Sequence, residues 1–189
     1  MFSREESLAF FMEHNNNDMY LRHALAVEAA MRGFAADLGA DADYWGQAGL
    51  LHDIDWETSQ SAETHPMMGA GWLNEKGYPE DFVRAVLAHG WEFSGVEPVS
   101  DLEKTLYTID ELTGFVTAVA LVRPSKSLRD LEVKSVKKKW KDKSFARGVN
   151  REVIEKGSKL MNRPLDLLIE KTIEYLKPVE KQIGLGSAE

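Results

Sequence analysis

The 189-residue sequence contains no cysteine. This absence excludes disulfide bonds, thiolate metal ligands and a cysteine nucleophile, and it fits a reducing compartment. The first six residues, Met1–Glu6, place acids where a secretory signal would need an apolar stretch. The longest nearly apolar run, residues 115–122, is far shorter than the roughly 20 residues that a membrane span requires. We therefore expect a soluble, cytoplasmic protein with no membrane association.

Repeats, low-complexity blocks and linkers rich in proline, glycine or serine are also missing. A chain of this length, with 43% hydrophobic residues, can bury one substantial core. No segment alternates between apolar and polar residues with the period of two that a strand would need. Apolar residues instead recur at helical spacing between capping residues. The pattern predicts an all-α fold class, with helices packed around one core.

Capping residues predict where most of these helices begin and end. Ser100 and Glu103 form a capping box, and the helix that they start should continue to about Val122, before Pro124. The other expected helices run from a cap at Asp18 to Leu38 and Gly39, from a cap at Asp41 through His52, from a cap at Thr64 to Gly77, from Pro79 to His89, from Asn150 onward, and from Pro164 to Leu176.

Positive charge is concentrated in one segment of an otherwise acidic chain. The net charge is −8, yet residues 126–151 contain ten basic and three acidic side chains, so this segment carries +7 and the remainder −15. Such asymmetry indicates a local anionic ligand rather than general nucleic-acid binding. The ordinary explanation, a solvated basic surface, stays open for any single lysine.

Four of the five histidines fall at the ends or faces of predicted buried helices. Taken singly, each has an ordinary explanation as a core or surface residue. Asp110 is different, because it stands in the middle of a largely apolar predicted helix. A carboxylate that faces the core there must be paired or bound to a metal, whereas one that faces solvent needs no partner. The four histidines are His23, His52, His65 and His89.

The order of these residues, with Asp53 directly after His52, resembles the HD superfamily, specifically members with a binuclear site. The resemblance rests on residues 21–28, on residues 49–55, and on the later histidines and Asp110, so its core spans residues 15–125. Residues 108–115, 123–126 and 143–152 also look like segments of bacterial predicted HD-superfamily hydrolases. The resemblance implies a single HD domain over 1–178, made of this core and a C-terminal helical extension over 126–178, followed by a tail over 179–189.

A binuclear HD site implies a role for each of the six residues. One divalent transition metal would be held by His23, His52, Asp53 and Asp110. The other would be held by His65, His89 and a bridging Asp53. Imidazole and carboxylate ligands suit iron, manganese, cobalt, nickel or zinc. Asp55, Glu57 and Glu63 could orient the histidines as hydrogen-bond acceptors.

The commonest activity that the resemblance implies is phosphohydrolysis. Two adjacent divalent ions can bridge a water, lower its pKa and create a hydroxide nucleophile, with Asp53 and His52 as the catalytic residues. The expected substrate is a small phosphorylated anion, such as a phosphate ester or a nucleotide. The basic segment would supply the side chains that bind it, and the candidates are Lys126, Lys134, Lys137 and Arg147.

Two alternatives remain open at this point. The same six residues resemble diiron HD oxygenases, in which iron activates dioxygen. We see no clear tyrosine-glutamate pair like that of the phosphonate oxygenases, although Tyr20 lies near the corresponding region. The other alternative is a non-catalytic HD module that binds a ligand, although such a module has no need for so many buried ionisable groups. The sequence does not indicate an oligomeric state.

Overall fold

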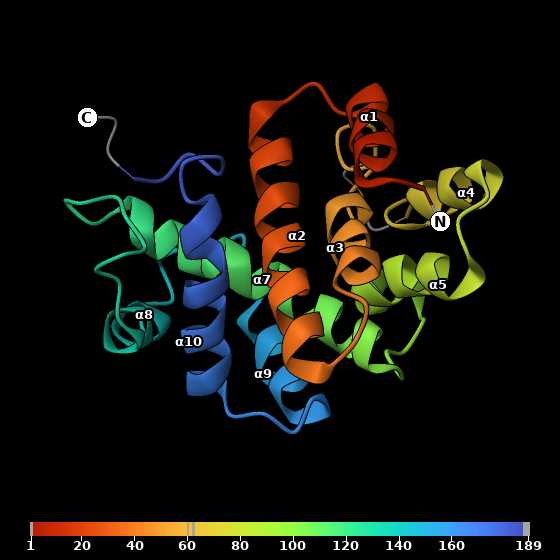
Figure 1. The fold of residues 1–189 in the computed structure, drawn as a ribbon. Helices are drawn as coiled ribbons and strands as arrows, with labels where there is room; N and C mark the ends of the chain where they lie inside the picture. Colours follow the sequence, from red (N-terminus) through yellow and green to blue (C-terminus); the bar gives the residue numbers. More distant parts are fainter. Residues whose placement is uncertain (1, 60, 62, 187–189) are drawn as a thin grey trace.

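The computed structural model describes residues 2–59, 61 and 63–186, and Figure 1 shows these residues folded into helices joined by loops. No strand occurs among them, which confirms the all-α fold class. None of the described helices is both long enough and apolar enough to span a membrane. The helices are α1 Arg4–His14, α2 Asp18–Leu38, α3 Ala42–Leu51, α4 Met67–Lys76, α5 Glu80–His89, α6 Trp91–Ser94, α7 Asp101–Leu121, α8 Val133–Trp140, α9 Arg151–Leu160, α10 Leu165–Leu176 and the 3-10 helix Lys177–Val179.

Most of the predicted helix ends are confirmed. The Ser100 hydroxyl accepts a hydrogen bond from the Glu103 amide at 3.3 Å, and the Glu103 carboxylate accepts one from the Ser100 amide at 3.0 Å. Asp41 caps α3, and Gly39 ends α2 with a left-handed φ of 67°. The predicted cap at Thr64 is wrong, because α4 begins only at Met67, after Pro66.

Three further helix details were not predicted correctly. The cap of α2 is Asn17, whose side chain accepts a hydrogen bond from the Met19 amide, and Asp18 is the first helical residue. His52 does not continue α3 but occupies the position directly after its last turn. The helix α1 was missed, although Ser3 and the glutamate three residues later form a capping box like that of α7.

Two glycines allow helices to approach closely. A Cβ atom at Gly49 of α3 would lie 2.9 Å from the backbone oxygen of Val27 in α2. A Cβ atom at Gly157 of α9 would lie 2.0 Å from the Thr108 hydroxyl oxygen in α7. The central helix α7 contacts α2, α3, α5, α8, α9 and α10. Helices from both halves of the chain therefore pack against one element that carries Asp110.

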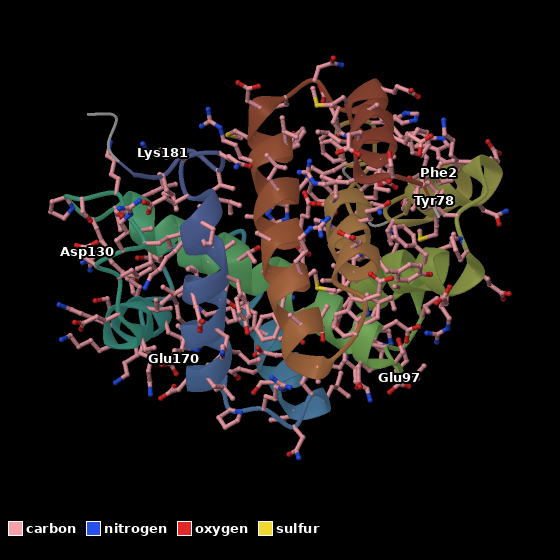
Figure 2. All side chains as sticks on the ribbon, viewed as in Figure 1. Phe2, Tyr78, Glu97, Asp130, Glu170 and Lys181 are labelled. Atoms are coloured by element: carbon pink, nitrogen blue, oxygen red, sulfur yellow. The ribbon has the colours of Figure 1, made fainter. Side chains whose placement is uncertain are left out.

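The two ends of the described chain pack onto the same body. At the amino end, the rings of Phe2 and Tyr78 lie 4.8 Å apart, and both residues are labelled in Figure 2. Toward the carboxyl end, in the segment predicted as a tail, Ile183 and Leu185 are buried in the core. The nearby Glu180 carboxylate is also buried and accepts hydrogen bonds from residues 127–129.

Candidate metal centre

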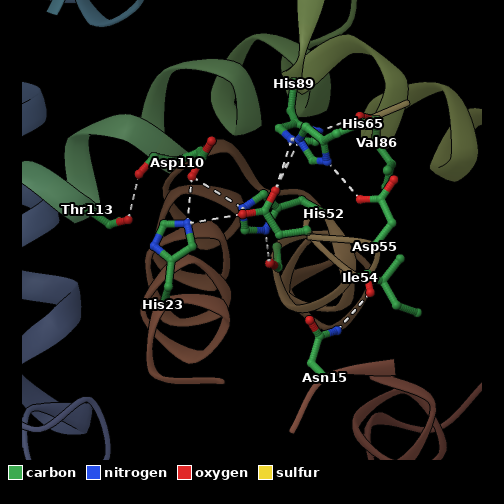
Figure 3. Close-up of polar contacts among 12 residues, drawn as sticks. Asn15, His23, His52, Ile54, Asp55, His65, Val86, His89, Asp110 and Thr113 are labelled. Atoms are coloured by element: carbon green, nitrogen blue, oxygen red, sulfur yellow. Dashed lines mark hydrogen bonds and ion pairs between the residues drawn. The ribbon is translucent and has the colours of Figure 1, made fainter. Parts of the chain in front are cut away.

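The six predicted ligands come from five parts of the fold and meet in one place. Figure 3 labels five of them, namely His23, His52, His65, His89 and Asp110. His52 and Asp53 follow the last turn of α3, where the chain leaves the helix. The others lie on separate elements: His23 on α2, His65 just before α4, His89 at the end of α5, and Asp110 in the middle of α7.

One half of the cluster gathers around Asp110. The His23 Nε2 atom lies 2.8 Å from Asp110 Oδ1 and 3.8 Å from Asp53 Oδ2. The His52 Nε2 atom lies 3.3 Å from Asp110 Oδ1 and 3.4 Å from Asp53 Oδ2. The ligand atoms of His23, His52 and Asp110 all lie within 4.8 Å of one another, so this group could hold a metal ion.

The other half of the cluster gathers around the second oxygen of Asp53. The Nε2 atoms of His65 and His89 each lie 3.4 Å from Asp53 Oδ1, and they lie 3.2 Å from one another. The carboxylate of Asp53 therefore directs one oxygen into each half. His52, Asp53 and His89 form a second group whose ligand atoms could hold an ion.

Hydrogen bonds at the opposite ring nitrogens fix the tautomers of three histidines. His52 Nδ1 lies 2.7 Å from the Gly49 carbonyl oxygen, and His89 Nδ1 contacts the Val86 carbonyl oxygen. A carbonyl oxygen only accepts, so each Nδ1 atom carries a hydrogen and donates it. A neutral ring then presents the lone pair of Nε2 to the cluster, which is the form that ligates a metal.

His65 is oriented by a buried carboxylate in the same way. Its Nδ1 atom lies 2.7 Å from Asp55 Oδ1, while Asp55 Oδ2 accepts a hydrogen bond from the Gly69 amide at 2.8 Å. Asp55 is completely buried. Of the three acids that the sequence suggested as orienting residues, Glu57 instead accepts hydrogen bonds from the backbone between α1 and α2. Glu63 is exposed.

This arrangement fits a bound cation. The fully buried Nε2 atom of His52 makes no hydrogen bond, although it faces two carboxylate oxygens. Lone pairs that face carboxylates, or one another, repel unless a positive charge lies between them. Burial lowers the pKa of His52, but Asp53 and Asp110 outweigh it and raise that pKa well above its usual value. Nitrogen and carboxylate donors of this kind suit divalent transition metals.

The cluster forms the floor of a cavity of about 380 Å³, which all its members line except the fully buried His52. Its wall includes the aromatic residues Tyr20, Trp56 and Phe93, and no lysine or arginine of the described chain lines it. Glu111 also lines the cavity, and its carboxylate accepts a hydrogen bond from the backbone N–H of Asn150 at 2.9 Å. Burial and the charge of the neighbouring Asp110 raise the pKa of Glu111 to about 7. The only feature of the sequence that could have indicated Glu111 as a site residue is its position next to Asp110.

The four predicted substrate-binding cations lie apart from this floor. Lys134 and Lys137 each pair with an exposed carboxylate, at 2.5 and 2.7 Å, and Lys126 is exposed. None of these three lines the cavity described above. Arg147 also lies outside it, but the next residue, Gly148, belongs to its wall. Their role in substrate binding stays a prediction.

Comparison with known proteins identifies the family. A family model described as "HD domain" matches residues 20–114, about half of the chain and a range that contains all six clustered residues. Ribonuclease Y of Desulfotalea psychrophila is 29% identical over 168 residues, which are 82% of this chain and 32% of that protein. Ribonuclease Y of Oleidesulfovibrio alaskensis is 33% identical over 95 residues, which are 50% of this chain and 18% of that protein.

The chain thus spans about a third or less of the length of these curated relatives. No solved structure is significantly similar to it. The resemblance to the HD superfamily that the sequence indicated is confirmed by the family match. With helices alone in the described chain and all six residues inside the matched range, the protein belongs to the HD domain family.

Proposed function

We propose that the protein is a metal-dependent phosphohydrolase with two divalent ions in this cluster. The observation that carries the proposal is the position of Asp53, whose two oxygens face separate groups of histidines. A carboxylate placed in this way can bridge two ions. One ion would be held by His23, His52, Asp53 and Asp110, and the other by His65, His89 and Asp53.

When bound, two divalent ions supply Lewis acidity that activates water and neutralises phosphate oxygens. The chain's own residues prepare the site for this chemistry. Asp53 and His52, the proposed catalytic residues, both follow directly after α3, and the two oxygens of Asp53 face the two halves. Asp55 holds the His65 ring in one tautomer.

The substrate that we propose is a small phosphate ester or a nucleotide. A cavity of about 380 Å³ is within the size range of small-molecule sites. The names of the relatives add phosphodiesters of RNA to the substrates that should be tested. Monoesters and diesters therefore both belong in the assay.

Two measurements test the proposal. Protein purified without chelators is expected to contain close to two transition-metal ions per chain by elemental analysis. It is also expected to release product from at least one member of a panel of nucleotides, aryl phosphates and short RNAs. The Asp53→Ala variant should lose metal and activity together, whereas the control Glu170→Ala, at an exposed carboxylate on α10, should keep both. Less than one ion per chain, or activity unchanged by Asp53→Ala, would overturn the proposal.

The same experiment separates the two alternatives. Tyr20 lines the cavity, so the oxygenase alternative has one residue in its favour. Oxygen consumption with ferrous iron, without release of phosphate or nucleotide, would support that alternative. A non-catalytic module would show neither activity, and its ligand binding would survive Asp53→Ala.

A further inference from the structure

We call the cavity of about 380 Å³ above the candidate ligands the metal cavity. A second cavity, of about 720 Å³, adjoins it. The two share a rim made of Gly148, Val149 and Asn150, which line both. We call the second one the basic cavity, because its lining contains four cations against two acids. These residues are Lys141, Lys143, Arg147 and Arg151, with Glu152 and Glu155.

The shared rim lies directly against the helix that carries the metal-centre carboxylate. The backbone N–H of Asn150 donates a hydrogen bond to Glu111 Oε2 at 2.9 Å, and Glu111 follows Asp110 on α7. One turn further along α7, a Cβ atom at Gly114 would lie 3.8 Å from Val149. The rim is therefore anchored to α7 next to the metal centre, and the basic cavity begins on its other side.

Three of the four cations in the basic cavity are free to bind a ligand. Arg151 is occupied, because its guanidinium donates to two backbone carbonyls and lies 4.7 Å from the centre of the Phe115 ring. Lys141, Lys143 and Arg147 are exposed, and no carboxylate of the described chain pairs with them. Unpaired cations around a concave surface concentrate positive potential and attract anions.

No lysine or arginine of the described chain lines the metal cavity. Additional negative charge on a ligand would therefore have to pair with cations outside this cavity. We propose that the basic cavity binds a second phosphate group of a substrate whose reacting phosphate lies in the metal cavity. The substrate would then carry at least two phosphates, either along an oligonucleotide backbone or in a nucleoside polyphosphate. This inference rests on the proposed phosphohydrolase function.

The test compares two triple variants that lose the same charge. The cavity variant neutralises the three free cations, and the control variant neutralises three exposed lysines that lie outside both cavities. Affinities are measured for a labelled RNA trinucleotide, for GTP and for GMP at fixed ionic strength. The cavity variant is Lys141→Gln/Lys143→Gln/Arg147→Gln, and the control variant is Lys138→Gln/Lys159→Gln/Lys181→Gln.

The cavity variant is expected to lose about tenfold in affinity for the trinucleotide, for GTP or for both, and less than about twofold for GMP. A plot of the logarithm of trinucleotide affinity against the logarithm of salt concentration should become shallower in the cavity variant. The slope should change by about 0.7 for each phosphate that the variant no longer neutralises. The control variant should change each affinity by less than about twofold. A loss with the trinucleotide alone identifies the oligonucleotide backbone, and a loss with GTP alone identifies a polyphosphate.

Equal losses in the two triple variants would overturn the inference, as would an equal loss for GMP or an absence of binding by the trinucleotide and GTP. The outcome is independent of catalysis, because binding is measured directly. Asp53→Ala separates the two proposals further: it should abolish hydrolysis but leave the contribution of the basic cavity to binding intact.

Discussion

Asp55 and His65 form a buried pair in which the carboxylate Oδ1 atom lies 2.7 Å from the ring Nδ1 atom. The second oxygen of Asp55 is held by the Gly69 amide, so the carboxylate cannot rotate without losing a hydrogen bond. The pair fixes which nitrogen of His65 faces Asp53. Its importance can be measured without changing any proposed metal ligand.

Replacement of Asp55 by asparagine should weaken metal binding. The amide group introduced in this way can donate to His65 Nδ1, which would move the ring hydrogen to Nε2 and remove the ligating lone pair. Removal of such an orienting partner typically costs ten- to a hundredfold in metal affinity. Competition with a chromophoric chelator measures the affinity, and Asp166→Asn, at an exposed carboxylate, is the control. Unchanged affinity would show that the fold alone orients His65.

Substitutions in the two halves of the cluster should remove different numbers of ions. Asp110 contacts only the half that contains His23 and His52, so Asp110→Asn should leave about one ion per chain. Asp53 contacts both halves, so Asp53→Asn should leave less than one. Elemental analysis of both purified variants distinguishes these results. Equal metal content in the two variants would contradict a bridging role for Asp53.

Gly157→Ala should destabilise the protein, although alanine is the better helix former. A Cβ atom at this position would lie 2.0 Å from the Thr108 hydroxyl oxygen, so α9 must move away from α7. We expect a loss of about 1–3 kcal/mol in the free energy of unfolding, measured in urea. The control is Gly71→Ala on α4, where nothing lies within 4 Å and a gain of about 0.5–1 kcal/mol is expected. Similar effects at both positions would contradict the close contact.

Leu185→Ala tests whether the segment after residue 178 belongs to the folded domain. The Leu185 side chain is 1% exposed, so its truncation should cost about 2–4 kcal/mol in the free energy of unfolding. Leu121→Ala, at a leucine that is 46% exposed, should change it by less than about 0.5 kcal/mol. Chemical denaturation compares the two variants. A negligible effect of Leu185→Ala would support a domain that ends at 178.

Sequence patterns predicted those features that depend on local chemistry. The caps at Ser100 and Asp41 form hydrogen bonds within a few residues, so their helix ends could be assigned correctly. The order of the histidines indicated the family. The residues alone could not predict that the two oxygens of Asp53 face different groups of histidines. This arrangement depends on the side-chain rotamer of Asp53 and on the packing of four surrounding elements.

The features that the sequence did not indicate depend on long-range packing. Ile183 and Leu185 are two residues apart with a glycine between them, so no helical period marks them as core residues. In the basic segment, periodicity could not tell which lysines face a cavity. In the structure, Lys141 and Lys143 line the basic cavity, whereas Lys134 pairs with Glu132.

The acidic lining of the metal cavity has a consequence for the order in which the proposed metal ions and substrate would bind. Asp53, Asp110, Glu92 and Glu111 all line this space, and no lysine or arginine of the described residues does so, although Lys156 pairs with Glu92 at 3.2 Å from outside the lining. A phosphate that arrives before the metal meets a field of its own sign and is repelled. If the proposed function holds, divalent ions would reverse that field, and a phosphorylated substrate would then bind more readily after the metal than before it.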